Sequence, residues 1–277
     1  MQRLLDFLSE SPNPFLRALF WVITIVLLLL CVAVIGIAIF VVGIVIWAFV
    51  TSNTTVNGDF TYFDHKDYIT LSNYNGTETA IVLPAEIDGV PVTSITYMID
   101  KSGLVEDVTI PDELALAASE EDMNVFCIDF PALQNYHVSA DHPTLMTIDG
   151  VLYSKDGKTL LAYPVGRTGE AVIPEGVEVI WFGAFRNSAA SSVVLPQSLR
   201  TISSYSMCDF RVMRLLTIPQ GVTEIDENAF TNTNTNSMKL QLIVTQDSPA
   251  HSWALEYDFP IREVLPATQD PAQAPAA

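Results

Sequence analysis

Apolar and polar positions follow the same pattern in three stretches of the C-terminal half of the chain. Each stretch begins at a proline, with apolar residues three and six positions later and a small residue followed by a large apolar one at positions ten and eleven. A short run of β-branched or aliphatic residues precedes each proline. The prolines, Pro174, Pro196 and Pro219, are 22 and 23 residues apart. A repeat of this length is typical of a solenoid, in which each unit buries its apolar face against its neighbours.

The pattern also predicts the conformation of each unit. The run before the proline is expected to be a short strand, because β-branched residues favour a pleated surface, and the proline ends it because its nitrogen cannot donate to the ladder. Positions three and six then face the core, and the small residue at position ten lets the next coil approach closely. The alternative is an ordinary β-rich protein with proline-containing turns. The residues that end the strands are expected to face inward: Ile110, Ile173, Leu195 and Ile218.

The repeat continues upstream with less regularity. The same strand-and-proline ending occurs at 81–84 and 108–111. After Pro84 the apolar pair comes late, as if a tight turn at Asp88-Gly89 had been inserted. After Pro111 the pattern decays into a loop at 118–147 that begins with acidic residues.

Four segments together resemble one known family. They are Val-Thr-Ile-Pro at 108–111, Gly-Val-Glu-Val-Ile at 176–180, Leu-Thr-Ile-Pro at 216–219 and Gly-Val-Thr-Glu-Ile-Asp-Glu-Asn-Ala-Phe at 221–230. These segments resemble the BspA-like leucine-rich repeats, and the similarity covers about residues 60–264. Ser206-Met207 departs from the family pattern, which favours Ala-Phe there. The resemblance implies a noncatalytic scaffold at a bacterial envelope, with a hairpin that interrupts the coils at about 145–165.

The N-terminal part contains an apolar run, residues 18–50, without a single charged side chain. A membrane span needs only about 20 apolar residues, and a cleaved signal peptide has an apolar core of only about 7–15. The run therefore predicts an uncleaved transmembrane signal anchor. Arg3 and Arg17 precede it and the next basic residue is Lys66, so the positive-inside rule favours a cytoplasmic N-terminus and an extracellular repeat domain.

The expected fold is a β-rich solenoid of stacked short parallel strands with a β-hairpin insertion and a C-terminal capping helix, preceded by one transmembrane α-helix. Ser248-Pro249 is a favourable helix start for the cap, because serine suits the N-cap and proline the first helical position. The predicted parts are a cytoplasmic segment at 1–17, the anchor at 18–50, capping strands at 51–78, repeats at 79–264 with the cap at 246–264, and a disordered tail at 265–277.

Charge restricts the partners of the chain. The net charge is −19, and residues 1–50 contain two basic and two acidic side chains, so the excess belongs to 51–277. Such a domain repels nucleic-acid phosphates and anionic membrane surfaces, and it attracts basic partners. Simple solubility is the alternative reason for the charge.

Few residues are candidates for catalysis or for metal binding. No metalloprotease, nucleophile-elbow or phosphate-loop motif occurs, so we expect no enzyme and no cofactor. His137 and His142 with Cys127 and Asp141 form the one metal-like group, and solvated loop residues are the favoured interpretation. Cys127 and Cys208 can be paired or free, and two buried free thiols are favoured.

The predicted binding surface follows from strand geometry. If the residue before each proline faces inward, the residues two and four before it face outward. Stacking would align these outward residues on one exposed sheet as a β-branched strip beside acidic groups. Stabilisation of the sheet is the alternative role. The candidate positions are Val82, Thr109, Val172, Val194 and Thr217, with Asp107, Glu170 and Ser192 beside them, flanked by Ala80 and Leu215.

The sequence therefore predicts a membrane-anchored, extracytoplasmic protein that binds a protein or a surface polymer. The alternative is a structural component of an envelope complex that has no external ligand.

Overall fold

The computed structural model describes residues 54–114, 128–210, 212–233 and 240–266, together with Phe15, Val22 and Ile25. The chain divides into two compact units, Met1–Thr54 and Thr55–Ala277. Within the described residues, no helix is long and apolar enough to cross a membrane. The predicted anchor at 18–50 lies outside these residues except for Val22 and Ile25, which are helical.

The second unit begins with a twisted sheet. In it β2 and β3 form an antiparallel hairpin, and β6 pairs in parallel with β3. β5 pairs with the start of β6 through the turn predicted at Asp88-Gly89, and β8 pairs with its end. The strands of this sheet are β1 (Thr54–Asn57), β2 (Phe60–Asp64), β3 (Ile69–Tyr74), β5 (Glu86–Ile87), β6 (Val90–Asp100) and β8 (Ile128–Asp129).

A second sheet comes from three successive coils. β4 (Ala80–Val82), β7 (Asp107–Ile110) and β9 (Asn135–Val138) pair in parallel in this order. β8 and β9 lie in the segment that the sequence analysis assigned to a loop, so that expectation is wrong for residues 128–129 and 135–138. Residues 135–138 continue the strand stack because Tyr136 is buried in register with Val108.

The predicted hairpin is present. β10 (Leu145–Ile148) and β11 (Val151–Ser154) pair antiparallel, and β12 (Thr159–Ala162) returns along β11. β12 then starts a parallel sheet in which each later strand belongs to the next coil. These strands are β14 (Val179–Ile180), β16 (Thr201–Ile202) and β18 (Glu224–Ile225).

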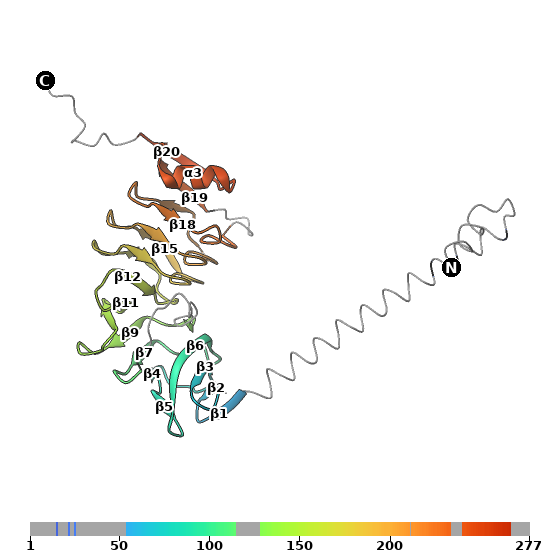
Figure 1. The fold of residues 1–277 in the computed structure, drawn as a ribbon, viewed down its shortest axis with the longest axis vertical. Helices are drawn as coiled ribbons and strands as arrows, with labels where there is room; N and C mark the ends of the chain where they lie inside the picture. The colour runs from blue at the N-terminus through green and yellow to red at the C-terminus, as the bar shows by residue number, and fades with distance from the viewer. Residues whose placement is uncertain are drawn as a thin grey trace. The chain divides into compact units, whose positions relative to one another are not determined.

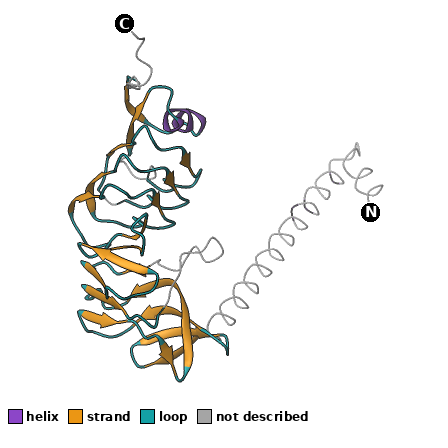
Figure 2. Cartoon of the chain, turned by 60° about the vertical axis from the view of Figure 1, so that its left-hand side comes forward, coloured by secondary structure: helices purple, strands orange, loops and turns teal. Residues whose placement is uncertain are grey.

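The other sheets of the C-terminal coils come from the runs before the prolines. β13 (Gly169–Val172) pairs in parallel with β15 (Ala190–Val194), and β17 (Leu215–Thr217) pairs with β19 (Gln241–Thr245), which pairs with β20 (Ile261–Leu265). Within the second unit these coils follow one another as a stack (Figures 1 and 2). The repeat region is therefore a parallel β-solenoid, as the periodicity predicts.

The cap contains α3 (Pro249–Glu256) and ends with a strand. The hydroxyl oxygen of Ser248 accepts a hydrogen bond from His251 N at 3.1 Å, which is the predicted N-cap. Ala250, Trp253 and Ala254 are buried against the last coil. Leu265, which was assigned to the disordered tail, ends β20, and the tail from residue 267 onward lies outside the described residues.

The core confirms the predicted register. The residues that end the strands are buried, with Ile110 at 1%, Ile173 at 3%, Leu195 at 7% and Ile218 at 2% exposure. The small residues at position ten are also buried, and their carbonyls accept hydrogen bonds from the preceding coil. These hydrogen bonds run from Tyr163 N to Ala184 O, from Phe185 N to Ser206 O and from Met207 N to Ala229 O. Ser206-Met207 thus fits the same position as Ala184-Phe185, and the coil is regular there.

Candidate binding surface

The residues predicted to face outward lie on the surface of the strand stack. Val82 is 61% exposed, Val172 64% and Val194 45%. Thr217 and Glu170 are also exposed, whereas Thr109, Asp107 and Ser192 are half-buried. These aliphatic side chains lie on strands whose opposite face is packed, and a partner that covered them would bury apolar surface. We call the eight predicted residues the sheet face.

Strand register determines which members of the sheet face are neighbours. Val82 pairs with Thr109, Val172 with Val194, and Glu170 with Ser192. Thr217 pairs instead with Ile243 of β19. The single exposed sheet expected from the sequence is therefore wrong. The sheet face is divided among three sheets, and the β10–β11 hairpin separates the first group from the second along the chain.

The sequence analysis missed two residues of this surface. Asn135 and His137 of β9 continue the rows of Asp107 and Thr109. Their alternation with the inward-facing Tyr136 was the available signal, because it repeats the alternation around Val108 in β7. His137 Nε2 lies 2.7 Å from Asp107 Oδ1, and Asn135 Nδ2 donates to the same oxygen at 3.1 Å.

A polar network fixes this end of the sheet face. The hydrogen bond from His137, together with that from Asn135, holds the pKa of Asp107 below its usual range. Arg167 Nη2 donates to Asn135 Oδ1 at 2.8 Å, and Arg167 Nη1 lies 3.4 Å from Asp149 Oδ2. Asp107 is therefore a preoriented anion that lies beside the half-buried Thr109.

In the described part of the chain, the two candidate histidines have hydrogen-bond partners of their own. His137 belongs to the pair just described, and His142 is fully buried. His142 Nδ1 accepts hydrogen bonds from Thr144 N at 3.2 Å and Leu145 N at 3.1 Å, so Nε2 carries the proton that is shared with Leu114 O at 3.3 Å. No group of three metal-ligating side chains occurs in the described part of the chain, and Cys127 lies outside it.

The remaining cysteine is not poised for chemistry. Cys208 is a free, buried thiol. Burial, with the nearby carboxylate of Asp209, raises the pKa of this thiol to about 12. A thiol in such surroundings is inert, because the thiolate is the nucleophile and the metal ligand. Cys208 packs in the core as the sequence predicted.

Comparison with known proteins places the repeats in a family. The solenoid with its proline-ended strands is a leucine-rich-repeat-like fold. More specifically, residues 167–248 match the BspA type leucine rich repeat region (6 copies), so this part of the chain has repeats of that type. The family resemblance seen in the sequence is confirmed for these residues. BspA-type repeats are a non-enzymatic scaffold. No curated protein matches the chain.

Several solved structures are similar to the chain. A leucine rich cell surface protein from Faecalibacterium prausnitzii is 13% identical, with a TM-score of 0.34 over 79% of this chain and 96% of that one. A leucine-rich repeat protein from Eubacterium ventriosum is 12% identical, with a TM-score of 0.38 over 77% and 84%. A leucine rich repeat protein from T. pallidum is 17% identical, with a TM-score of 0.30 over 76% and 82%. The family assignment rests on the matched repeats alone.

Proposed function

We propose that the protein is a noncatalytic binding protein of the bacterial cell surface, and that the sheet face contacts its partner. The observation that supports this proposal is the exposure of Val82, Val172 and Val194 on strands whose other side is packed. Exposed aliphatic groups gain free energy when a partner covers them, by roughly 25 cal/mol per Å² of apolar surface. The partner is a protein or a surface polymer.

Charge gives the partner a second property. Asp107 and Glu170 flank the aliphatic positions, and the whole chain has a net charge of −19. A partner with basic groups beside an apolar strip would complement this surface, and opposite net charges would accelerate its association. This association should weaken as the salt concentration rises.

The test is capture from an envelope extract by the full-length chain with four substitutions in the sheet face. Thr109, Val172, Val194 and Thr217 are replaced by lysine, which reverses the local charge and removes the aliphatic surface. Capture should be lost while circular dichroism stays unchanged. The matched control places four lysines at exposed positions elsewhere, at Thr77, Thr93, Gln197 and Gln246, and should retain capture. Equal capture by both variants would show that the partner does not bind at the sheet face.

We further propose that residues 18–50 anchor the chain in the cell membrane with the repeats outside. The uncharged run and the two preceding arginines support this topology. Protease added to intact cells should then remove the repeat domain. Cleavage only after lysis would contradict the orientation.

The second candidate function is structural, as part of an envelope complex without an external ligand. The division of the sheet face into three strand groups favours it, because this division leaves no single continuous sheet for an external ligand. The control described above distinguishes the two functions: a structural component co-purifies with the same membrane proteins from its own cells, whichever four lysines it carries.

A further inference from the structure

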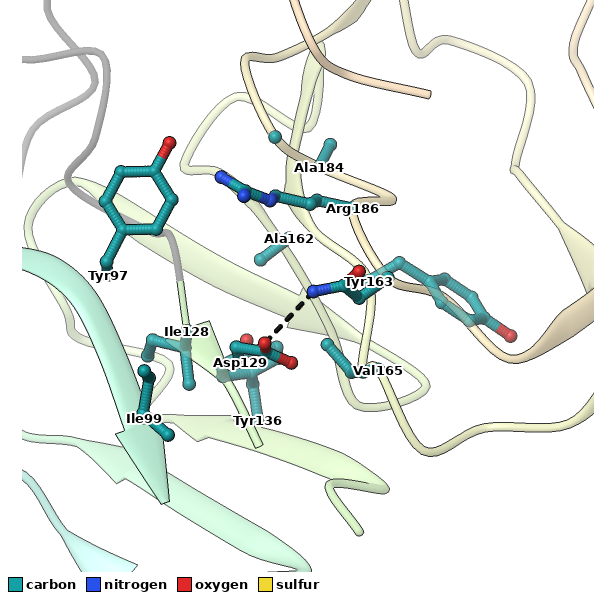
Figure 3. A pocket seen from close by; sticks show the side chains of 12 residues that line it. Tyr97, Ile99, Ile128, Asp129, Tyr136, Ala162, Tyr163, Val165, Ala184 and Arg186 are labelled. Carbon is teal, nitrogen blue, oxygen red and sulfur yellow. Dashed lines mark hydrogen bonds between the residues drawn. The ribbon is translucent and has the colours of Figure 1, made fainter. Parts of the chain in front are cut away.

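A pocket separate from the sheet face lies where the N-terminal sheet meets the coils that follow the hairpin. Its volume is about 170 Å³. Tyr97 and Ile99 come from β6, Ile128 and Asp129 from β8, and Arg186 from the loop after β14 (Figure 3). Ala162, Val165 and Ala184 complete an apolar wall. The pocket therefore combines a mostly apolar interior with a few charged groups, which is the usual composition of a small-ligand site.

Asp129 has an unused acceptor in this pocket. Its Oδ2 accepts a hydrogen bond from Asn187 Nδ2 at 3.0 Å, marked by the dashed line in Figure 3. Its Oδ1 is buried and has no hydrogen-bond partner among the described residues. A buried carboxylate oxygen without a donor is costly, and natural proteins rarely leave one unsatisfied. Asn187 fixes the carboxylate, and no described residue donates to its Oδ1.

Tyr97 supplies a second, independent sign of a built site. Its φ angle is +40°, which is strained for an aromatic residue. The register of β3 with β6 explains this conformation: Leu71 pairs with Ile95 and Asn73 with Ile99, so three residues of β6 oppose one of β3. Such bulges reorient a side chain, and strained residues gather at ligand sites.

Arg186 holds the ring of Tyr97 in place. Its Cζ lies 4.5 Å from the centroid of that ring, and its Nε lies 3.7 Å from Asp209 Oδ2. Figure 3 shows Arg186 beside Tyr97, whereas Asp129 lies on the side of Ile128 and Val165. The charge of Arg186 is therefore directed toward Tyr97 and Asp209, and Asp129 is left as the carboxylate that a ligand can neutralise.

We propose that this pocket binds a primary ammonium group on a short apolar body. The ammonium donates to Asp129 Oδ1, and the hydrocarbon packs against Ile99, Ile128 and the ring of Tyr97. A charge-assisted hydrogen bond is about twice as strong as a neutral one, so an ammonium fits this acceptor better than an alcohol does. A dry cavity of roughly 150 Å³ can hold benzene, so a body of four to six carbon atoms has about the right size.

Two sources can supply this chemistry. One is a free short amine, and the other is the side chain of a lysine on a partner protein. Both place an ammonium at the end of a hydrocarbon stem, so Asp129 is required in either case. They differ in whether the pocket also accommodates the peptide backbone at its mouth.

The test is a titration of the full-length chain in a mild detergent, with the isoleucine δ1-methyl groups labelled for NMR. n-Butylammonium should shift the resonances of Ile99 and Ile128 saturably, at about millimolar concentration. Asp129→Asn should weaken this binding about tenfold or more, because its amide presents a donor in place of Oδ1. Asp141→Asn removes the same charge at an exposed site and should bind as the parent does.

Titrations with two other compounds identify the ligand class and its source. 1-Butanol should bind about tenfold more weakly than n-butylammonium. Saturable binding of Nα-acetyl-lysine methylamide, lost on Nε-acetylation, would indicate a lysine of a partner, whereas binding of the free amine alone would indicate a small-molecule site. No saturable shift with n-butylammonium, equal binding by Asp129→Asn, or equal binding of 1-butanol would overturn the proposal.

Discussion

From β13 to β18 successive coils have short and nearly constant lengths, whereas the coils that carry β4, β7 and β9 are longer. Val179 pairs with Thr201 and Thr201 with Glu224, which are offsets of 22 and 23 residues. In the N-terminal coils Ala80 pairs with Asp107 and Asp107 with Asn135, which are offsets of 27 and 28.

Both regions satisfy part of their turn backbones through carbonyls of the neighbouring coil, as in the hydrogen bonds from Gln134 N to Glu106 O and from Arg200 N to Glu178 O. In the long coils, buried titratable side chains accept further N–H groups. Asp100 accepts from Ser102 N and Val105 N, and His142 accepts from the two N–H groups described above. The turns of the long coils at Asp100 and His142 therefore depend on individual buried polar side chains.

The largest expected effect tests whether the short coils form one cooperative stack. Ile218→Asp places an unpaired charge at a position with 2% exposure, and we expect a loss of more than about 4 kcal/mol of stability. Because each coil packs on its neighbours, hydrogen exchange should lose protection throughout 190–266 and retain it in β3 and β6.

The neighbouring residue provides the control for this experiment. Thr217 is exposed on the other side of β17, so Thr217→Asp should change the stability by only about 0.5 kcal/mol. An unchanged unfolding temperature of Ile218→Asp would contradict the assigned register.

A smaller effect is expected in the long coils, where the stability contributed by Asp100 should depend on pH. Burial of Asp100 opposes its ionisation, but hydrogen bonds from Val105 and Ser102 outweigh this and hold its pKa below the usual range. The carboxylate therefore contributes stability above the unfolded-state pKa of about 4, and this contribution is lost as the pH falls through the lower folded-state pKa. Asp100→Asn should cost about 1–3 kcal/mol at pH 7, because its amide cannot accept from both partners.

The measurement is the urea midpoint of both proteins at pH 7 and at pH 2. The difference between them should shrink in acid, as Asp100 of the parent becomes protonated. Asp67→Asn, at an exposed position, should match the parent at both pH values. A constant difference across the pH range would show that the carboxylate charge of Asp100 is not what stabilises the turn.

The contrast between the regions also explains what the sequence could predict. The strands that end in proline, their inward residues and the N-cap at Ser248 follow from local patterns, because each signal lies within a few residues. β9 was missed because Val138 is followed by Ser139 in place of the proline that marks the other coils. Its pairing with β7 depends on contacts 28 residues apart.

The candidate sites divide in the same way. The outward positions of the sheet face were predictable from alternation, but their division among three sheets depends on strand pairing that alternation does not encode. The pocket had no signal in the sequence. Tyr97, Asp129 and Arg186 belong to different coils, and only the stacking of those coils, with the bulge in β6, brings them together.

The smallest expected effect comes from a substitution that places the same residue at position ten of all three short coils. Ser206 occupies the position of Ala184 and Ala229, is fully buried, and its hydroxyl has no hydrogen-bond partner among the described residues. An unsatisfied buried hydroxyl costs about 1–3 kcal/mol, and alanine fills nearly the same space without it. We therefore expect Ser206→Ala to stabilise the protein by about 1 kcal/mol, visible as a higher urea midpoint with an unchanged slope. Ala184→Ser is the reciprocal variant and should lose a similar amount. If Ser206→Ala instead lowers the midpoint, the hydroxyl has a partner such as an ordered water. The close approach of neighbouring coils at this position would then depend on that hydrogen bond as well as on a small side chain.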